Sequence, residues 1–219
     1  MKTFKQVGID FETDKVLHHG YHLYYPQYLE HLRSKTFNML EIGLGSFTHY
    51  TGNSNKLWNK YFPQAKVFIM DIDHEYQDEY SIIIKGDQSQ LSDLKNLKNL
   101  IKNADFIIDD GSHHPEHQLL TFKYFFKDLL NPGGTYIIED IECSYWDPQS
   151  EIYGYKTGHL NIVDYFTKYQ HEINSEFNQN TNPLNLSTIT FGPNFIVIKK
   201  RTQEEIDFYN REYRFKYKL

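Results

Sequence analysis

Acidic residues and one histidine stand where two apolar segments of the sequence end. Asp109 and Asp110 follow "DFII", Glu139 and Asp140 follow "TYII", and His113 comes three residues after Asp110. If the two segments are neighbouring strands of a parallel sheet, their axes lie ~4.8 Å apart and these side chains meet at one edge. Carboxylates so close together repel one another unless a cation lies between them.

The pattern predicts a site for a hard divalent cation, because carboxylate oxygens are the ligands that Mg²⁺ prefers. We predict Asp110, Glu139 and Asp140 as the metal ligands. His113 follows Asp110 through the turn Gly111–Ser112, which returns its imidazole over the strand ends, where it can act as a general base.

The other histidines of this stretch favour plainer interpretations. His114 and His117 fit the first turn of a helix, and the four-residue spacing of His113 and His117 is a weak zinc signal without further N or S ligands. An iron-dependent hydroxylase that uses His113 and Asp110 is disfavoured, because only one histidine is well placed.

A glycine-containing turn follows the first apolar run, in "LEIGLGS". Gly43 and Gly45 allow a ligand to approach the backbone, and Glu41 suits a cationic or hydroxyl-rich group. The third glycine of the dinucleotide fingerprint is replaced by Thr48, so a pyrophosphate cradle is not expected. An ordinary turn between strand and helix explains this motif alone equally well.

The next two strand ends add acids that fit a nucleoside. Asp71 lies at about the spacing expected of an acid that accepts from ribose hydroxyls, with Asp73 as an alternative. Asp87, in "KGDQSQ", can accept from an adenine amino group. Each acid alone is more often a helix cap, but three at successive strand ends favour a cofactor site.

Apolar runs that alternate with helical patterns predict an α/β protein with a doubly wound, Rossmann-like and mostly parallel sheet. We expect seven strands, the last two forming a C-terminal antiparallel hairpin around Gly192 and Pro193. Helices are expected over residues 25–33, 53–63 and 114–130, in "SQLSDLKNLKNLI", and in "HLNIVDYFTKYQHEIN". Ligands of such sheets bind at the carboxyl ends of the strands, where these acids lie.

Length and composition bound the remaining classes. The 219 residues fit one domain, residues 1–219, and the net charge of −6 disfavours a nucleic-acid partner. The lone Cys143 excludes an internal disulfide, and neither a signal-peptide core nor an apolar run long enough to span a membrane is seen. We expect a cytoplasmic protein without a membrane partner, and a homodimer on base rates alone.

Several segments together resemble the Mg²⁺-dependent sugar O-methyltransferases of antibiotic biosynthesis, which use S-adenosylmethionine (SAM). The similarity spans roughly residues 12–146 and is most specific in "DFIIDDGSHHPEHQLLTFKYFFKDLLNPGGTYIIEDIECSYW". Within that family, the chain is similar to macrolide deoxysugar 2-O-methyltransferases and to the rhamnose O-methyltransferases of tetracenomycin type.

The resemblance implies a class I SAM-dependent methyltransferase fold with SAM and Mg²⁺ as cofactors and a sugar or glycoside as substrate. It implies that residues 1–34 form a helical segment over the cofactor site. It assigns the metal ligands and the base as above. It matches Glu41, Gly43, Asp71 and Asp87 to cofactor contacts, and Thr13, Asp14 and Lys15 to the segment that helps close the cofactor site. The cofactor contacts that we predict in all are Thr13, Lys15, Glu41, Gly43, Gly45, Asp71, Asp87, Gln88 and Asp109.

Tyr145 and Trp146, in "CSYWDP", are candidates to stack on the sugar ring, although a packed loop is an equally good explanation. Two alternatives remain open: a metal-dependent methyltransferase that acts on a catechol, and a nucleotide-binding protein of the same fold without catalytic activity.

Overall fold

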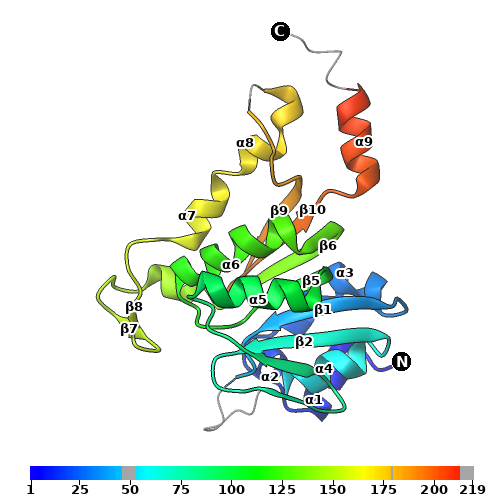
Figure 1. Ribbon diagram of the computed structural model, residues 1–219, viewed down its shortest axis with the longest axis vertical. Coiled ribbons are helices and arrows are strands. Elements are labelled where there is room, and N and C mark those ends of the chain that lie inside the picture. Colours follow the sequence, from blue (N-terminus) through cyan, green and yellow to red (C-terminus); the bar gives the residue numbers. More distant parts are fainter. Residues whose placement is uncertain (46–52, 179, 213–219) are drawn as a thin grey trace.

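A computed structural model describes residues 1–45, 53–178 and 180–212. Thr48, and most of the polar stretch that follows Gly45, lie outside these residues. The fold is built on one large sheet with the strand order β3-β4-β2-β1-β5-β6-β10-β9, shown in Figure 1. Its strands are β1 (Phe37–Ile42), β2 (Ala65–Asp71), β3 (Tyr76–Gln77), β4 (Ile82–Lys85), β5 (Ala104–Asp109), β6 (Leu130–Glu139), β9 (Leu186–Gly192) and β10 (Phe195–Lys200).

The centre of the sheet is parallel, as the alternating pattern predicted. Strands β4, β2, β1, β5 and β6 run parallel to one another, and β10 pairs antiparallel with both β6 and β9. The predicted C-terminal hairpin is therefore confirmed. The strands "DFIID" and "TYIIE" are direct neighbours, with Asp109 opposite Ile138, so their acidic ends lie at one edge of the sheet.

The expected count of seven strands was one too low for the main sheet. The additional strand β3 has two residues and pairs antiparallel with β4 at the sheet edge. A pairing this short carries no period-two pattern that a sequence reading can detect. A separate small hairpin of β7 (Glu151–Ile152) and β8 (Tyr155–Lys156) lies after β6.

Helices cover both faces of the sheet (Figure 1). The α-helices are α1 (Phe4–Asp10), α2 (Asp14–Leu17), α3 (Pro26–Leu29), α4 (Ser54–Tyr61), α5 (Leu91–Ile101), α6 (Pro115–Asp128), α7 (Ile162–Thr167), α8 (Gln170–Ile173) and α9 (Gln203–Glu212). Short 3₁₀ turns are η1 (Tyr21–Leu23), η2 (Glu30–Leu32), η3 (Ile141–Tyr145) and η4 (Ser175–Phe177).

Each face of the sheet buries its own apolar cluster, which is how a doubly wound sheet uses strands that are apolar on both sides. One cluster joins Phe4, Tyr25 and Trp58 of the N-terminal segment and α4 to β1 and β5. The other joins Leu94 and Phe122 of α5 and α6 to the opposite side of the same strands.

Three predicted helices differ in extent from those observed. The expected helix 25–33 is divided into α3 and the 3₁₀ turn η2, which meet at Leu29 (φ −117°, ψ −19°). The segment "NPGG" does not merely end α6 but begins β6, where Gly133 at φ +78° donates its N–H to the Arg201 carbonyl. The helix expected after residue 159 is divided into α7 and α8.

In the part of the chain that the structure describes, every helix is too short or too polar to cross a membrane.

Candidate active site

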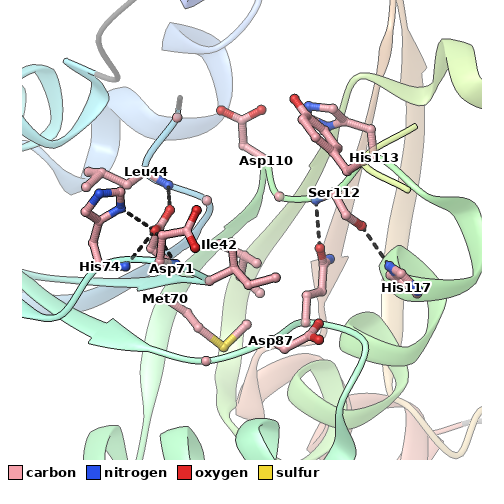
Figure 2. Close-up of a pocket in the computed structure, with 18 of the residues that line it drawn as sticks. Ile42, Leu44, Met70, Asp71, His74, Asp87, Asp110, Ser112, His113 and His117 are labelled. Carbon is pink, nitrogen blue, oxygen red and sulfur yellow. Dashed lines mark hydrogen bonds and ion pairs between the residues drawn. The ribbon is translucent and has the colours of Figure 1, made fainter. Parts of the chain in front are cut away.

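A cavity of about 680 Å³ opens at the carboxyl edge of the parallel strands, where the sequence placed the acids. This volume is within the usual range for small-molecule sites. Eight of the predicted site residues line it: Gly43, Gly45, Asp71, Asp87, Gln88, Asp110, His113 and Asp140. Figure 2 shows that Asp71, Asp87 and His113 come from different sides of the cavity.

The turn after β1 passes so close to the turn after β5 that a side chain at residue 43 has no room. Gly43 has φ +92°, and a Cβ built there would lie 2.1 Å from the Asp110 carbonyl oxygen. Hydrogen bonds from Gly43 N to Met70 O (2.8 Å) and from Asp110 N to Ile42 O (2.9 Å) hold the two turns in place. The glycine is therefore required by close backbone packing beside the cavity.

Asp71 ends β2 and fixes the glycine turn. Its Oδ2 accepts from Leu44 N at 3.1 Å, and its Oδ1 accepts from the backbone N–H groups of Asp73 and His74 (Figure 2). His74 Nδ1 lies 2.6 Å from the same oxygen. The carboxylate thus lies beside the glycine turn at the cavity wall, and its contact with a ribose stays a prediction.

Gln88 joins the loop after β4 to the turn after β5. Its Nε2 donates to Asp109 Oδ1 at 2.6 Å, and its Oε1 accepts from Ser112 N at 2.9 Å. Asp87, the predicted adenine contact, accepts from Ser89 N through Oδ1 at 2.8 Å. One amide side chain thereby positions the backbone that leads to His113.

Asp110, His113 and Asp140 converge on one point. One possible ligand atom from each lies within 4.8 Å of the others. His113 Nε2 is 3.8 Å from Asp140 Oδ2. The backbones of His113 (φ 56°) and Asp140 (φ 51°) are both left-handed, a strained state for these residues that is common at functional sites.

A second buried cluster lies beneath this group, and it contains its own cation. The Lys15 ammonium is 2.6 Å from Asp110 Oδ2, 2.6 Å from Glu139 Oε2 and 3.5 Å from Glu41 Oε1. Tyr25 donates its hydroxyl to the other Glu139 oxygen at 2.5 Å. Each Glu139 oxygen thus already accepts one bond, and Glu139 does not belong to the group of described residues whose ligand atoms converge, so its role as a metal ligand stays a prediction.

The carboxylates of the two clusters differ in acidity. Burial raises the pKa of Glu41 to about 7, although Lys15 opposes the shift. For Asp110, burial also opposes ionisation, but Lys15 and His113 outweigh it and lower the pKa. Burial, reinforced by the Asp110 carboxylate, raises the pKa of Asp140. The structure thus favours a negative charge on Asp110.

The remaining predicted residues lie away from the cavity wall. Thr13 is buried at the start of α2, and Asp109 is buried against Gln88 and the Tyr136 hydroxyl. Glu41 accepts from Ser54 Oγ at 2.8 Å. Tyr145 and Trp146, the predicted sugar contacts, are exposed outside the residues that line the cavity.

The other side chains that line the cavity include His74, His117, Tyr153 and Tyr155, of which only His117 was considered from the sequence, as a weak zinc signal. His117 Nδ1 is 2.9 Å from Ser112 Oγ, and the Tyr155 ring meets His117 edge-on at 4.7 Å. The two tyrosines belong to the β7–β8 hairpin, whose strands of two residues give no periodic signal. Their aromatic character in the loop after "CSYWDP" is the one local signal that could have indicated them, and they were not among the predicted site residues.

Curated proteins with related sequences are sugar O-methyltransferases. The chain is 33% identical over 138 residues to the 8-demethyl-8-alpha-L-rhamnosyl tetracenomycin-C 2'-O-methyltransferase of Streptomyces olivaceus, covering 61% of this chain and 36% of the relative. It is 33% identical over 132 residues to the mycinamicin VI 2''-O-methyltransferase of Micromonospora griseorubida, covering 58% and 33%. The similarity that the motifs indicated is confirmed.

A solved structure matches over nearly the whole chain. It is the MycE methyltransferase of the mycinamycin biosynthetic pathway in complex with Mg and SAH, with a TM-score of 0.78 at 24% identity over 93% of this chain and 56% of that one. The chain therefore shares the Rossmann-like fold of that protein. No known family profile matches the sequence. The chain spans about a third of the length of the curated relatives that it matches.

Proposed function

We propose that the protein is a SAM-dependent and Mg²⁺-dependent O-methyltransferase that acts on a hydroxyl of a sugar. The observation that carries the proposal is the convergence of Asp110, His113 and Asp140 in the same cavity as the glycine turn and Asp71. Relatives named as sugar O-methyltransferases support the acceptor class.

The chemistry of the converging side chains fits a divalent cation. Asp110 and Asp140 offer oxygen ligands within 4.8 Å of each other, and ionisation of Asp110 is favoured by Lys15. When bound, Mg²⁺ supplies Lewis acidity that lowers the pKa of a coordinated hydroxyl. Asp140 is oriented for this role by Tyr21, whose hydroxyl donates to Oδ1 at 2.7 Å, and by Asn194 Nδ2 at 2.9 Å.

The opposite part of the cavity fits the adenosyl group of SAM. Gly43 leaves its wall free of a side chain, while Asp71 and Asp87 place carboxylates at successive strand ends. SAM supplies a methyl group on a sulfonium cation, so the protein needs only to bind it and to align the acceptor. Asp14 of the N-terminal segment also lines the cavity, which supports the role of that segment in covering the cofactor.

His113 is proposed as the general base. Its imidazole lies between the Asp140 carboxylate and the Tyr153 ring, whose centroid is 6.1 Å from that of His113. A neutral imidazole at this point accepts the proton of a hydroxyl held beside Asp110 and Asp140. The Asp140 carboxylate then stabilises the resulting imidazolium at 3.8 Å.

The dependence on metal is tested with purified protein, SAM and a deoxysugar glycoside. We expect S-adenosylhomocysteine to form only with Mg²⁺ present, to stop in excess EDTA, and to resume when Mg²⁺ is restored. Calorimetry with S-adenosylhomocysteine and, separately, with NAD tests the nucleoside site independently, because the two ligands represent the two candidate classes of cofactor. Undiminished turnover in EDTA would exclude the metal.

The base is tested with His113→Ala. We expect kcat to fall by about 10²-fold to 10⁴-fold, because the hydroxyl proton loses its acceptor, while the affinity for S-adenosylhomocysteine is retained. The exposed His159 provides the matched control, and His159→Ala should keep wild-type turnover. Wild-type kcat in His113→Ala would refute the assignment.

A further inference from the structure

Resting on the proposed function, we propose that the β7–β8 hairpin forms the acceptor subsite. The ring of Tyr153 stacks on the apolar face of one sugar residue, and the rest of the glycoside extends from there into solvent. The sugar would thus be bound by Tyr153 and Tyr155, and not by Tyr145 and Trp146 as the sequence suggested.

The hairpin is fixed beside the acidic group by bonds at its base. His114 Nε2 at the start of α6 is hydrogen-bonded to the Lys156 carbonyl. Thr157 donates its N–H to Ser150 O at 2.9 Å and its hydroxyl to Asp147 O at 2.8 Å. The turn residues Tyr153 (φ 49°) and Gly154 (φ 81°) therefore project from an anchored base.

Tyr153 lies on the acceptor side of the cavity. Its ring centroid is 6.1 Å from that of His113, at an interplanar angle of 50°. Partial burial, together with the carboxylates of Asp110 and Asp140, raises the pKa of its phenol, which agrees with a ring that faces these acids. An acceptor on this ring has its hydroxyls within reach of Asp110, His113 and Asp140.

Tyr155 forms a second wall, which packs edge-on against two histidine rings. Its ring meets His117 at 4.7 Å and 84°, and His114 at 6.1 Å and 62°. His117 is in turn held by Ser112, two residues from the metal ligand Asp110. Tyr155 is 38% exposed and Tyr153 is 66% exposed, so the subsite has a more covered side and a more open side.

A glycoside fits this arrangement through its two kinds of surface. The C–H face of a pyranose is apolar and packs on an aromatic ring, while its hydroxyls point outward to polar groups. Tyr153 is 66% exposed although it lines the cavity, which leaves a path for a substituent on the anomeric carbon to reach solvent. The chemical class that this predicts is a terminal sugar joined to a larger carrier.

The test compares two tyrosines that are equally exposed. Tyr145 is also 66% exposed but does not line the cavity, so Tyr145→Ala is the matched control for Tyr153→Ala. Binding of methyl α-L-rhamnopyranoside to the full chain, loaded with S-adenosylhomocysteine and Mg²⁺, is followed by saturation-transfer NMR and calorimetry. We expect Tyr153→Ala to raise the Kd at least about fivefold and Tyr145→Ala to leave it unchanged.

The affinity for S-adenosylhomocysteine separates this proposal from the proposed function. If Tyr153→Ala keeps that affinity and loses the rhamnoside, the subsite is supported. The proposal is overturned if Tyr145→Ala has the larger effect, if neither variant changes the Kd, or if wild-type protein binds catechol in preference to the rhamnoside. Failure of wild-type protein to bind S-adenosylhomocysteine would instead refute the cofactor assignment.

Discussion

Gly43 shows how a single residue fixes the geometry of the site. Its backbone lies against the Asp110 carbonyl, so the glycine turn after β1 and the turn that carries Asp110 are in close contact. The sequence indicated a glycine turn with a ligand nearby. The structure adds that the group leaving no room for a side chain at residue 43 is the protein's own backbone at Asp110.

We expect Gly43→Ala to reduce the free energy of unfolding by about 3 kcal/mol. The alanine would have a left-handed backbone, its Cβ would overlap the Asp110 carbonyl oxygen, and the hydrogen bonds that hold the two turns prevent them from moving apart. Gly154→Ala is the matched control, since Gly154 also has positive φ (+81°) but nothing lies within 4 Å of the position that a Cβ would take there. Urea unfolding measures both, and equal losses would show that the overlap is harmless.

Charge placement at the residue level was predicted only in part. The alternation of strands and acids was enough to predict that Asp110 and Asp140 lie together at one edge of the sheet, because the pattern indicates parallel pairing. It did not reveal that Glu139 points to Lys15 and Tyr25 instead of the cavity. The alternation along a strand indicates which side a residue faces, but it does not indicate what lies there. The partners of Glu139 come from the distant N-terminal segment.

At the scale of elements, the N-terminal segment is joined to the strand ends by buried charge. Helix α2 contributes Lys15, which contacts Asp110 at the end of β5 and Glu139 at the end of β6. The Tyr25 hydroxyl, just before α3, adds a further bond to Glu139. The resemblance implied that Lys15 contacts the cofactor, and that contact stays a prediction; the structure adds the ion pairs of Lys15 with Asp110 and Glu139.

Lys15→Met should lower the free energy of unfolding by about 3 kcal/mol at neutral pH, because buried carboxylates lose their counter-charge. Lys2→Met provides the contrast, since the ion pair of Lys2 with Asp10 lies at the surface, and a loss below about 1 kcal/mol is expected. Denaturant midpoints compare the two variants. A loss no larger than that of Lys2→Met would mean that the buried carboxyls are protonated.

Among the elements, the long periodic ones were predictable and the short ones were not. The leucines of α5 and the apolar runs of β1 and β5 pack as their spacing indicates. The β7–β8 hairpin, which carries Tyr153 and Tyr155 into the cavity, is too short to show a period. Its position is set by tertiary bonds to His114 and Asp147, which no local pattern encodes.

The molecule as a whole is built on one main sheet between two apolar clusters. Its free energy of unfolding depends on pH through buried carboxyl groups such as Glu41. Glu41 is fully buried, and burial raises its pKa to about 7. Between the ordinary pKa of a glutamate and pH 7 the folded state therefore holds a proton that the unfolded state has released. The contribution of the protonated Glu41 side chain to the free energy of unfolding is therefore complete at low pH, and it is lost as the pH rises through about 7.

We expect Glu41→Gln to flatten this dependence. Relative to the variant, the wild-type protein should lose on the order of 3 kcal/mol of unfolding free energy between about pH 4.5 and pH 8. The exposed Glu75 supplies the control, and Glu75→Gln should follow the wild-type profile. Urea titrations across this pH range measure the difference, and parallel curves for the wild type and Glu41→Gln would contradict the linkage.

Gln88 is bonded at both ends of its amide, to Asp109 and to the Ser112 backbone. Gln88 therefore links the loop beside Asp87 to the turn that leads to His113. We therefore expect a ligand that displaces the loop beside Asp87 to shift the turn that leads to His113 as well, through Gln88.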